Sequence, residues 1–305
     1  MLVGCTAPPH RVLYVNSYHA GYASSDSIRA DIEAGMTKAG VELKTICLDS
    51  KRNGQPDSIA RHVQEALRTI ESWRPDVLMV SDDNAVSYLV TPHLMSGPLP
   101  VVFCGVNWSC EQYGLPNAHV TGMLEVLPIE ASLKLLKAHV PGAKTLTILS
   151  ENTPSEISNK KYMDHFYTEA GLTPTYVLVN TFAGWKQEFI RANRGSDLVY
   201  LPTNGAIRGW DNQEAEQFVR DNIRVPVFTC DDFMMPYAVV GLTKIAREQG
   251  DWAAETALKI LNGASPADIP ITENRLSQAW LNPDLAEKIG FTPGPGENFI
   301  NMTQH

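Results

Sequence analysis

The sequence predicts an α/β fold with parallel sheets, arranged as two consecutive halves. Short apolar runs rich in β-branched residues alternate with segments of helical periodicity, which is typical of βαβ units. This alternation restarts near residue 125, so that each half contains four or five strands. A chain of 305 residues also fits two domains better than one.

The first half opens with the strand "RVLYV". A helix with Ile28, Ile32 and Met36 on its buried side follows it, and Gly40 ends this helix. Later helices are expected at 59–73 and 85–94. The remaining strands of this half are expected in "VELKTICLDS", "DVLMVSDDN", "LPVVFCGVNW" and "AHVTGML".

The second half repeats the pattern. Its strands are expected in "KTLTILSEN", "PTYVLVN", "DLVYLPTNG" and "VPVFTCDDF". Its helices are expected at 129–140, 156–170, 185–192 and 212–221. The C-terminal part is predicted to contain helices at 237–247 and 251–261, a strand and turn in "IPITENRLSQAWLN", and a loose Pro- and Gly-rich tail at 293–305.

Composition excludes several classes of protein. The formal net charge is -9 and no Lys/Arg cluster stands out, so nucleic acid is not an expected partner. No stretch reaches the ~18 uninterrupted apolar residues that a membrane span requires. Charged residues make up 19% and hydrophobic residues 44%, which is ordinary for a globular protein.

The N-terminus contains a candidate lipidation site. Leu2-Val3-Gly4-Cys5 resembles a bacterial lipobox, in which Cys5 would carry the lipid and residues 1–10 would form a tether. A chance tetrad is the alternative, because the charged and apolar regions of a signal peptide are missing. Export would permit disulfides among Cys47, Cys104, Cys110 and Cys230, with buried free thiols as the alternative.

Polar side chains follow the predicted strands in both halves. Ligands gather beyond the carboxyl ends of parallel strands, so these positions are the candidate binding residues. They are Asn16-Ser17-Tyr18-His19, Ser81-Asp82-Asp83-Asn84, Gly105-Val106-Asn107-Trp108, Ser150-Glu151-Asn152-Thr153, Pro202-Thr203-Asn204-Gly205 and Cys230-Asp231-Asp232-Phe233.

The order of these motifs resembles a known family. "VNSYHAGYASSD", "VSDDNAV" and "VVFCGVN", together with the two-half layout, look like the ABC-transporter substrate-binding protein family. The resemblance covers roughly residues 10–290. It implies the type I periplasmic binding protein fold, with two Rossmann-like lobes joined by a three-crossing hinge. Related modules act as extracytoplasmic sensors of bacterial kinases and cyclases.

The resemblance also implies a division of the chain. Lobe I would comprise 11–122 and 241–270, and lobe II would comprise 123–240 and 271–292. The crossings would lie near 121–125, 236–240 and 271–277. A small solute would be trapped in a cleft when the lobes close on the hinge.

Thirteen residues are expected to contact this solute. Tyr18, His19 and Tyr22 offer aromatic faces with polar edges, and the backbone N–H groups near Ser17 suit an anion. Either Asp82 or Asp83 would receive an ammonium group, although the sequence does not show which, and Asp231 is the acid expected to contact the solute in the second half. The set is Ser17, Tyr18, His19, Tyr22, Asp82, Asp83, Asn107, Trp108, Asn152, Thr153, Thr203, Asn204 and Asp231.

Catalysis is the weaker hypothesis. The sequence contains no Gly-x-Ser-x-Gly elbow, Walker A loop or Gly-x-Gly-x-x-Gly fingerprint, and no nucleophile with an evident base. Neighbouring acids on one strand end also point in different directions. We therefore expect no enzyme, no cofactor and no metal site, with an α/β enzyme as the remaining alternative.

The sequence thus predicts a periplasmic or cell-surface lipoprotein that binds a small solute for an ABC permease. The solute fits an amino acid, an aromatic one included, or another planar polar molecule such as a purine. The protein is expected to act as a monomer and to meet the membrane only through its lipid anchor. A sensory module that acts with a membrane kinase or cyclase is the main alternative.

Overall fold

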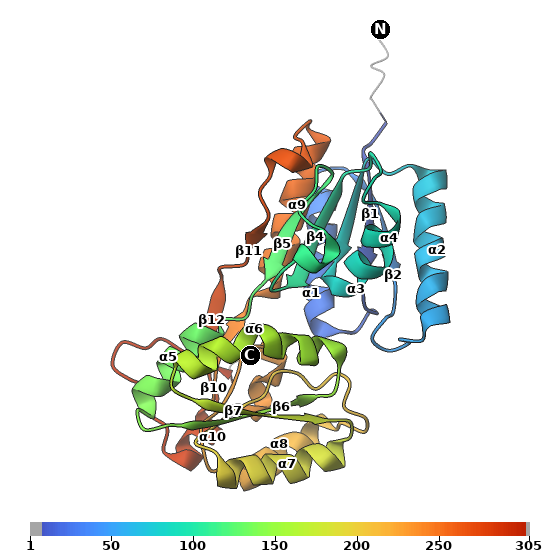
Figure 1. Ribbon diagram of the computed structural model, residues 1–305. Helices are drawn as coiled ribbons and strands as arrows, with labels where there is room; N and C mark the ends of the chain where they lie inside the picture. Colours follow the sequence, from blue (N-terminus) through green and yellow to red (C-terminus); the bar gives the residue numbers. More distant parts are fainter. Residues whose placement is uncertain (1–7, 303–305) are drawn as a thin grey trace. The chain divides into compact units, whose positions relative to one another are not determined.

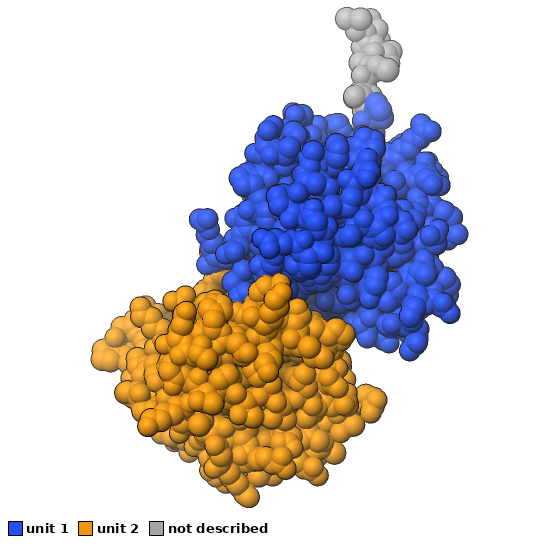
Figure 2. Space-filling view, viewed as in Figure 1, with its two compact units in different colours: residues 1–126, 246–275 blue, residues 127–245, 276–305 orange. Residues whose placement is uncertain are grey.

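The computed structural model describes residues 8–302, so the predicted lipidation site at Cys5 lies outside the described residues. The chain divides into two compact units, which Figure 2 colours blue and orange. Unit 1 comprises the described residues up to Val126 together with Ala246–Arg275. Unit 2 comprises Leu127–Ile245 and the described residues from Leu276 onward, so the chain passes between the units three times.

Unit 1 is built on a six-stranded parallel sheet with the order β11-β5-β4-β3-β1-β2. Its strands are β1 (Arg11–Asn16), β2 (Glu42–Cys47), β3 (Val77–Ser81), β4 (Val101–Asn107), β5 (Val120–Glu125) and β11 (Thr272–Glu273). Its helical segments are α1 (Ala23–Lys38), α2 (Pro56–Trp73), α3 (Asp82–Ala85), the π-helix η1 (Val86–Val90), α4 (Thr91–His93), η2 (Glu111–Tyr113), α9 (Ala246–Leu261) and η4 (Pro266–Asp268).

The alternation of side chains along β1 explains why both faces of this sheet are covered. Val12 and Tyr14 point to the face on which α1 and α9 pack, whereas Leu13 and Val15 point to the face covered by α2 and η1. All four side chains are fully buried. Figure 1 shows α9, in orange, alongside α1, in blue, although some 200 residues separate them in the sequence.

Unit 2 repeats this architecture on a seven-stranded sheet with the order β13-β12-β10-β9-β8-β6-β7. Only the β10–β12 pair is antiparallel. Its strands are β6 (Thr145–Glu151), β7 (Thr173–Val179), β8 (Leu198–Tyr200), β9 (Val227–Thr229), β10 (Val240–Lys244), β12 (Ser277–Leu281) and β13 (Ile300–Asn301). Its helices are α5 (Ile129–His139), α6 (Pro154–Glu169), α7 (Phe182–Gly195), α8 (Asn212–Asn222), η3 (Asp232–Tyr237) and α10 (Pro283–Ile289).

The core of unit 2 is aromatic on one side of the sheet. Trp185 and Phe189 of α7 are fully buried, and their rings lie 5.1 Å apart between centroids. Trp210 packs edge-on against Trp185 at 4.9 Å. Both tryptophans are therefore packing residues. Figure 1 shows α7 and α8 on this side of the sheet and α5 and α6 on the other.

The first five strands of each sheet, numbered within each unit along the chain from β1 and from β6, are arranged in the same spatial order: second, first, third, fourth, fifth. The connections leave the sheet in opposite directions at β1 and β3 in unit 1, and at β6 and β8 in unit 2. These pairs are the switch points at which open α/β sheets bind ligands. Within the described residues, no helix is both long enough and apolar enough to cross a bilayer.

The prediction of a helix at 237–247 is wrong. Residues 240–244 form strand β10, which pairs with β9 and β12, and α9 begins at Ala246. The apolar run around Val239 and Val240 fits a strand as well as a helix by composition, and the strand pairing decides between them. Gly241 permits this strand, because a Cβ there would lie 2.3 Å from the Met235 sulfur.

Strand pairing also assigns three segments differently from the predicted lobes. Residues 123–126 were expected in lobe II, yet β5 runs to Glu125 in the sheet of unit 1. Residues 241–245 were expected in lobe I, yet β10 belongs to the sheet of unit 2. Residues 271–275 were expected in lobe II, yet β11 pairs with β5 in unit 1. The predicted loose tail at 293–305 is likewise ordered in part, since β13 at Ile300–Asn301 pairs with β12.

Close packing of α9 on α1 generates a stability prediction. A Cβ at Gly250 would stand 2.5 Å from the Ile28 carbonyl oxygen of α1, whereas a Cβ at Gly195 of α7 meets nothing within 4 Å. We therefore expect Gly250→Ala to lower the free energy of unfolding by about 1–3 kcal/mol. Gly195→Ala, also a helical glycine, should be neutral or stabilising by about 0.5–1 kcal/mol. Urea unfolding of both variants checks this, and equal effects would contradict the packing argument.

Candidate ligand-binding site

Backbone strain in unit 1 is concentrated at the carboxyl edge of its sheet. Three residues other than glycine adopt positive φ there: Asp49 (51°) after β2, Asp82 (67°) after β3 and Trp108 (60°) after β4. Such conformations cost on the order of 1–3 kcal/mol each and cluster at functional sites. The same edge contains Gly105, at φ 70°, in a bulge of β4.

Ser17 connects the loops at this edge. Its hydroxyl donates to the Ser81 carbonyl oxygen at 2.6 Å and accepts from the Ala85 N–H at 2.7 Å. Its carbonyl oxygen accepts from the Ser50 N–H and hydroxyl, at 3.0 and 2.6 Å. Ser17 is fully buried, so its side chain serves as a structural tie between the ends of β1, β2 and β3.

The aromatic residues after β1 form a cluster with a lysine. The rings of Tyr18 and Tyr22 meet edge to face at 5.1 Å, and His19 lies 6.4 Å from Tyr22. The Lys51 ammonium donates to the Tyr22 hydroxyl at 2.8 Å. His19 Nδ1 also lies 3.4 Å from a carboxylate oxygen of Asp49. The structure thus brings all three predicted aromatic residues together at the switch point.

The adjacent acids Asp82 and Asp83 have different environments. Both oxygens of Asp83 accept hydrogen bonds: one from the Tyr113 hydroxyl at 2.7 Å, the other from the Asn107 side chain at 2.6 Å. Asp82 instead lies beside Gly105, with Oδ1 3.4 Å from the position of a Cβ on that glycine. Asp83 and Asn107 therefore stabilise the ends of β3 and β4 through hydrogen bonds, whereas Asp82 lies near Tyr18.

Electrostatics support this placement of Asp82. Burial raises the pKa of Tyr18 well above its ordinary value, and the charge of Asp82 adds the next largest contribution. The charges of Asp83 and Glu125 act in the same direction. The phenol of Tyr18 therefore faces a region of negative potential, where a cationic group of a ligand would be favoured.

Trp108 lines a groove along the same unit rather than the tyrosine cluster. The groove also contains Leu124, Pro116 and the returning segment at Pro266–Ile271. The Trp108 N–H donates to the Glu125 carbonyl oxygen at 3.0 Å, which holds the end of β4 against β5. The expectation that Trp108 forms a wall of the solute site stays a prediction.

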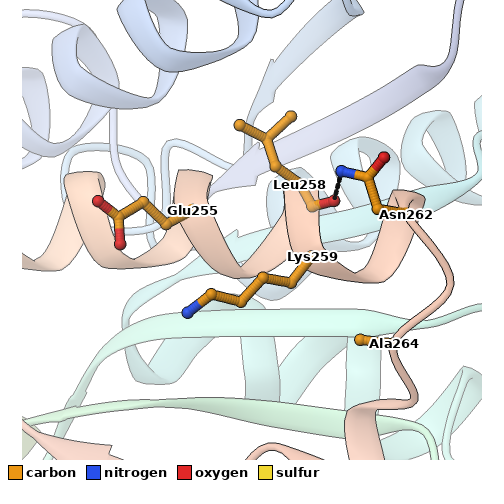
Figure 3. A pocket seen from close by; sticks show the side chains of 5 residues that line it. All are labelled: Glu255, Leu258, Lys259, Asn262 and Ala264. Carbon is orange, nitrogen blue, oxygen red and sulfur yellow. Dashed lines mark hydrogen bonds between the residues drawn. The ribbon is translucent and has the colours of Figure 1, made fainter.

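A second hollow, shown in Figure 3, lies away from the strand ends. Glu255, Leu258, Lys259, Asn262 and Ala264 line it at the C-terminal part of α9. The Asn262 amide turns back and donates to the Leu258 carbonyl oxygen at 2.8 Å. None of the predicted site residues borders this hollow.

In unit 2, the predicted site residues lie at the corresponding edge of the sheet, but their contacts differ from those in unit 1. The Thr153 hydroxyl caps α6 by accepting from the Glu156 N–H at 3.4 Å, which is long for a hydrogen bond. Asn152 is exposed and its amide reaches Asn180 at 3.3 Å. The Thr203 hydroxyl is a buried donor without a partner among the described residues, and Asn204 accepts from the Ile207 N–H through its carbonyl.

The most polar feature of unit 2 is a cluster of buried acids. Glu151, Glu156 and Asp231 are 0%, 6% and 4% exposed. The Lys244 ammonium lies 3.1 Å from an oxygen of Asp231. Glu151 also accepts from the Ala206 N–H at 2.6 Å, which ties the loops after β6 and β8 together at the switch point.

Glu156 and Lys244 were not among the predicted site residues. Glu156 occupies the first turn of α6, where an acid normally signals only the start of a helix. Lys244 was hidden by the wrong helix at 237–247, because its strand position puts its side chain beside Asp231. Only the assignment of residues 240–244 to a strand would have indicated that Lys244 lies beside Asp231.

The remaining chemistry of the described residues is sparse. Cys47, Cys104, Cys110 and Cys230 are free thiols, which settles the alternative that the sequence left open. In residues 8–302 no three His, Cys, Asp or Glu side chains are grouped so that they could hold a metal ion.

Burial raises the pKa of Glu156 to about 7, from an ordinary value of 4.5, and the charges of Glu151 and Asp231 add to this. The hydrogen bonds from Ser150 (2.7 Å) and Asn159 (2.9 Å) act in the opposite direction. Because the folded-state pKa is raised, the stability that Glu156 contributes is complete below pH 4.5. It is lost as the pH rises to about 7.

Glu156→Gln should remove this dependence, since the uncharged amide can accept from Asn159 through its oxygen and donate to the Ser150 hydroxyl through its nitrogen. We expect the melting temperature of the variant to exceed that of the wild type increasingly from pH 5 to pH 8. At pH 8 the free energy of unfolding of the variant should exceed that of the wild type by on the order of 3 kcal/mol. Glu130→Gln, at an exposed first-turn acid of α5, controls for the loss of a helix N-terminal charge. Parallel melting curves for Glu156→Gln and wild type across this range would contradict the assignment.

Comparison with known proteins now adds to this geometry. A family model described as ABC transporter substrate binding protein matches residues 22–294. A curated relative, the "Tyrosine-binding protein" of Clostridioides difficile (strain R20291), is 25% identical over 202 residues. That match covers 65% of this chain but 56% of the relative, so the chain spans little more than half of that protein.

Solved structures show the same fold. The ABC domain in complex with L-Trp from Streptococcus pneumonia superposes with a TM-score of 0.70 at 16% identity, over 92% of this chain and 95% of that one. The ligand-free, open structure of a substrate binding protein with adhesive properties from Clostridium difficile gives 0.72 at 17% identity, over 96% and 98%. These neighbours have the type I periplasmic binding protein fold, with two α/β lobes built on parallel sheets.

The match to the family model extends over most of the chain and includes the strand ends from β2 to β12, whereas β1 with Ser17, Tyr18 and His19 precedes it and β13 follows it. The fold of the solved neighbours and the predicted order of motifs agree with it. The chain therefore belongs to the ABC transporter substrate binding protein family.

Proposed function

We propose that this protein is an extracytoplasmic receptor that captures a free amino acid with an aromatic side chain and delivers it to an ABC importer. The family binds substrates and is not named for an enzymatic activity. The finer assignment, to an aromatic amino acid, comes from the chemistry of the switch point in unit 1.

The observation that carries this proposal is the pairing of rings and acids at that switch point. Tyr18 and Tyr22 present aromatic surface, which favours the side chain of an aromatic solute. Asp82 lies on the side of Tyr18 where the potential is negative, which favours an ammonium group. A solute that carries both an aromatic ring and an ammonium group satisfies both features.

Two relatives support the choice of solute class. One is described as tyrosine-binding, and the structure of another was determined with L-Trp. Their identities to this chain are 25% and 16%, so they suggest a class of solute rather than a single compound.

The proposed mechanism is capture without chemistry. The carboxyl edges of both units would contribute groups to the solute, and closure about the three chain connections would trap it. The measured affinity is then the intrinsic affinity of the closed form reduced by the cost of closing. We further propose that Cys5 carries a lipid anchor, that the protein acts as a monomer, and that the closed form docks on a membrane permease.

Native mass spectrometry of the purified protein, followed by identification of released small molecules, tests the solute directly. We expect L-tyrosine or L-tryptophan to be retained, or to raise the melting temperature when added in excess over its Kd. A protein that no amino acid stabilises, and from which none is released, would refute the capture of an amino acid.

The contrast between Asp82 and Asp83 provides a sharper check. Asp82→Asn keeps the size of the side chain and suits positive φ, but removes the charge that would pair with the ammonium. We expect it to weaken binding of L-tyrosine or L-tryptophan by about 10- to 100-fold with little change in melting temperature.

Asp83→Asn should instead act mainly on stability. Its carboxylate accepts from Tyr113 and Asn107, and the loss of the charge should cost about 1–2 kcal/mol of unfolding free energy. Isothermal titration and thermal melts of both variants separate the two roles. If Asp82→Asn bound as tightly as the wild type, the ammonium contact would have to be assigned elsewhere.

A further inference from the structure

The loop after β2 is held rigidly against the end of β1. One oxygen of Asp49 accepts from the Arg52 guanidinium at 2.9 Å and from the Asn53 amide at 2.5 Å. Ser50 donates to the Ser17 carbonyl oxygen through both its N–H and its hydroxyl. Lys51 lies between these hydrogen-bonded residues at the switch point.

The side chain of Lys51 contacts two tyrosine rings. Its ammonium lies 4.5 Å from the ring centroid of Tyr22 and 5.4 Å from that of Tyr18, in addition to its bond with the Tyr22 hydroxyl. A lysine held on two aromatic faces has lost part of its hydration, which strengthens its attraction for an anion. The cation therefore stands next to the rings that the proposed solute would meet.

Tyr18 is influenced both by this cation and by the acids of the same edge. Its ring faces Lys51, whereas its phenol is affected by the charges of Asp82 and Glu125. The edge of unit 1 therefore carries both a cation and carboxylates around one tyrosine.

An arrangement with opposite charges at one edge of a sheet complements a zwitterion. An α-amino acid carries its ammonium and carboxylate on one carbon atom, whereas an amine, a sugar or a nucleobase does not. We propose that Lys51 binds the carboxylate of the captured amino acid, and that the site thereby selects zwitterions over amines of the same shape. This inference rests on the proposed function, and it assigns the carboxylate contact to a side chain rather than to the backbone near Ser17.

The test compares L-tyrosine with L-tyrosinamide, and L-tryptophan with its amide, by isothermal titration on the full-length protein. The amides keep the ring and the ammonium group but lack the negative charge. We expect Lys51→Met, which retains the aliphatic stem, to weaken binding of the acids by about 10- to 100-fold. Binding of the amides should stay unchanged or become tighter, because the variant removes a repulsive charge.

Lys44→Met is the matched control. Lys44 lies within β2 of the same unit, and its ammonium is 4.4 Å from the ring centroid of Trp73, at the end of α2. This variant should bind acids and amides as the wild type does. Thermal melts establish that each variant is folded.

The outcomes distinguish the two proposals. A wild type that binds neither amino acid refutes the proposed function, and the role of Lys51 falls with it. A wild type that binds, together with a Lys51→Met variant that loses acid and amide equally, refutes the carboxylate contact and shows that Lys51 only shapes the loop. An unchanged affinity for the acids in Lys51→Met refutes the contact as well.

Discussion

The bulge in β4 leaves backbone groups that need hydrogen-bond partners from elsewhere in unit 1. The register of β4 on β5 shifts between Phe103 and Val106, so that the Gly105 N–H leaves the regular ladder. The Leu124 carbonyl accepts from the Asn274 N–H, just after β11, at 3.3 Å and has room for a second donor. The side chain of Gln249 satisfies both, accepting from Gly105 at 2.9 Å and donating to Leu124 at 3.0 Å. Buried backbone groups without partners would each cost about 1–3 kcal/mol.

Gln249 belongs to α9, which the chain reaches only after it has passed through unit 2. The carboxyl edge of the first sheet is therefore completed by a distant segment. The dense contact of α9 on α1, at Gly250 and at Gly35 against Ala254, keeps Gln249 in register with the bulge. The bulge in turn sets the direction of the backbone that leads to Asn107 and Trp108, so the shape of this edge depends on one glutamine.

The two units present different polar chemistry at equivalent positions. Unit 1 combines tyrosine rings, a lysine and acids that are partly accessible, which suits direct contact with a solute. Unit 2 buries three carboxylates near one lysine, and Glu156 holds its proton to about pH 7. The same strand order thus supports two sets of side chains, because a doubly wound sheet determines where loops meet but not what they carry.

The sequence by itself determined the class of fold, the alternation of elements and the positions of the strand ends, because strand and helix periodicity and turn residues act locally. Tyr18, Asp82 and Asn107 were recognisable for that reason. Only the tertiary structure decided that residues 240–244 form a strand and that Ser17 is a buried tie. It also separated the role of Asp83 from that of Asp82. Those outcomes depend on partners 20 to 145 residues away, such as Gln249 for Gly105 and Tyr113 for Asp83. Contacts between residues that are distant in the sequence leave no local pattern from which they could be read.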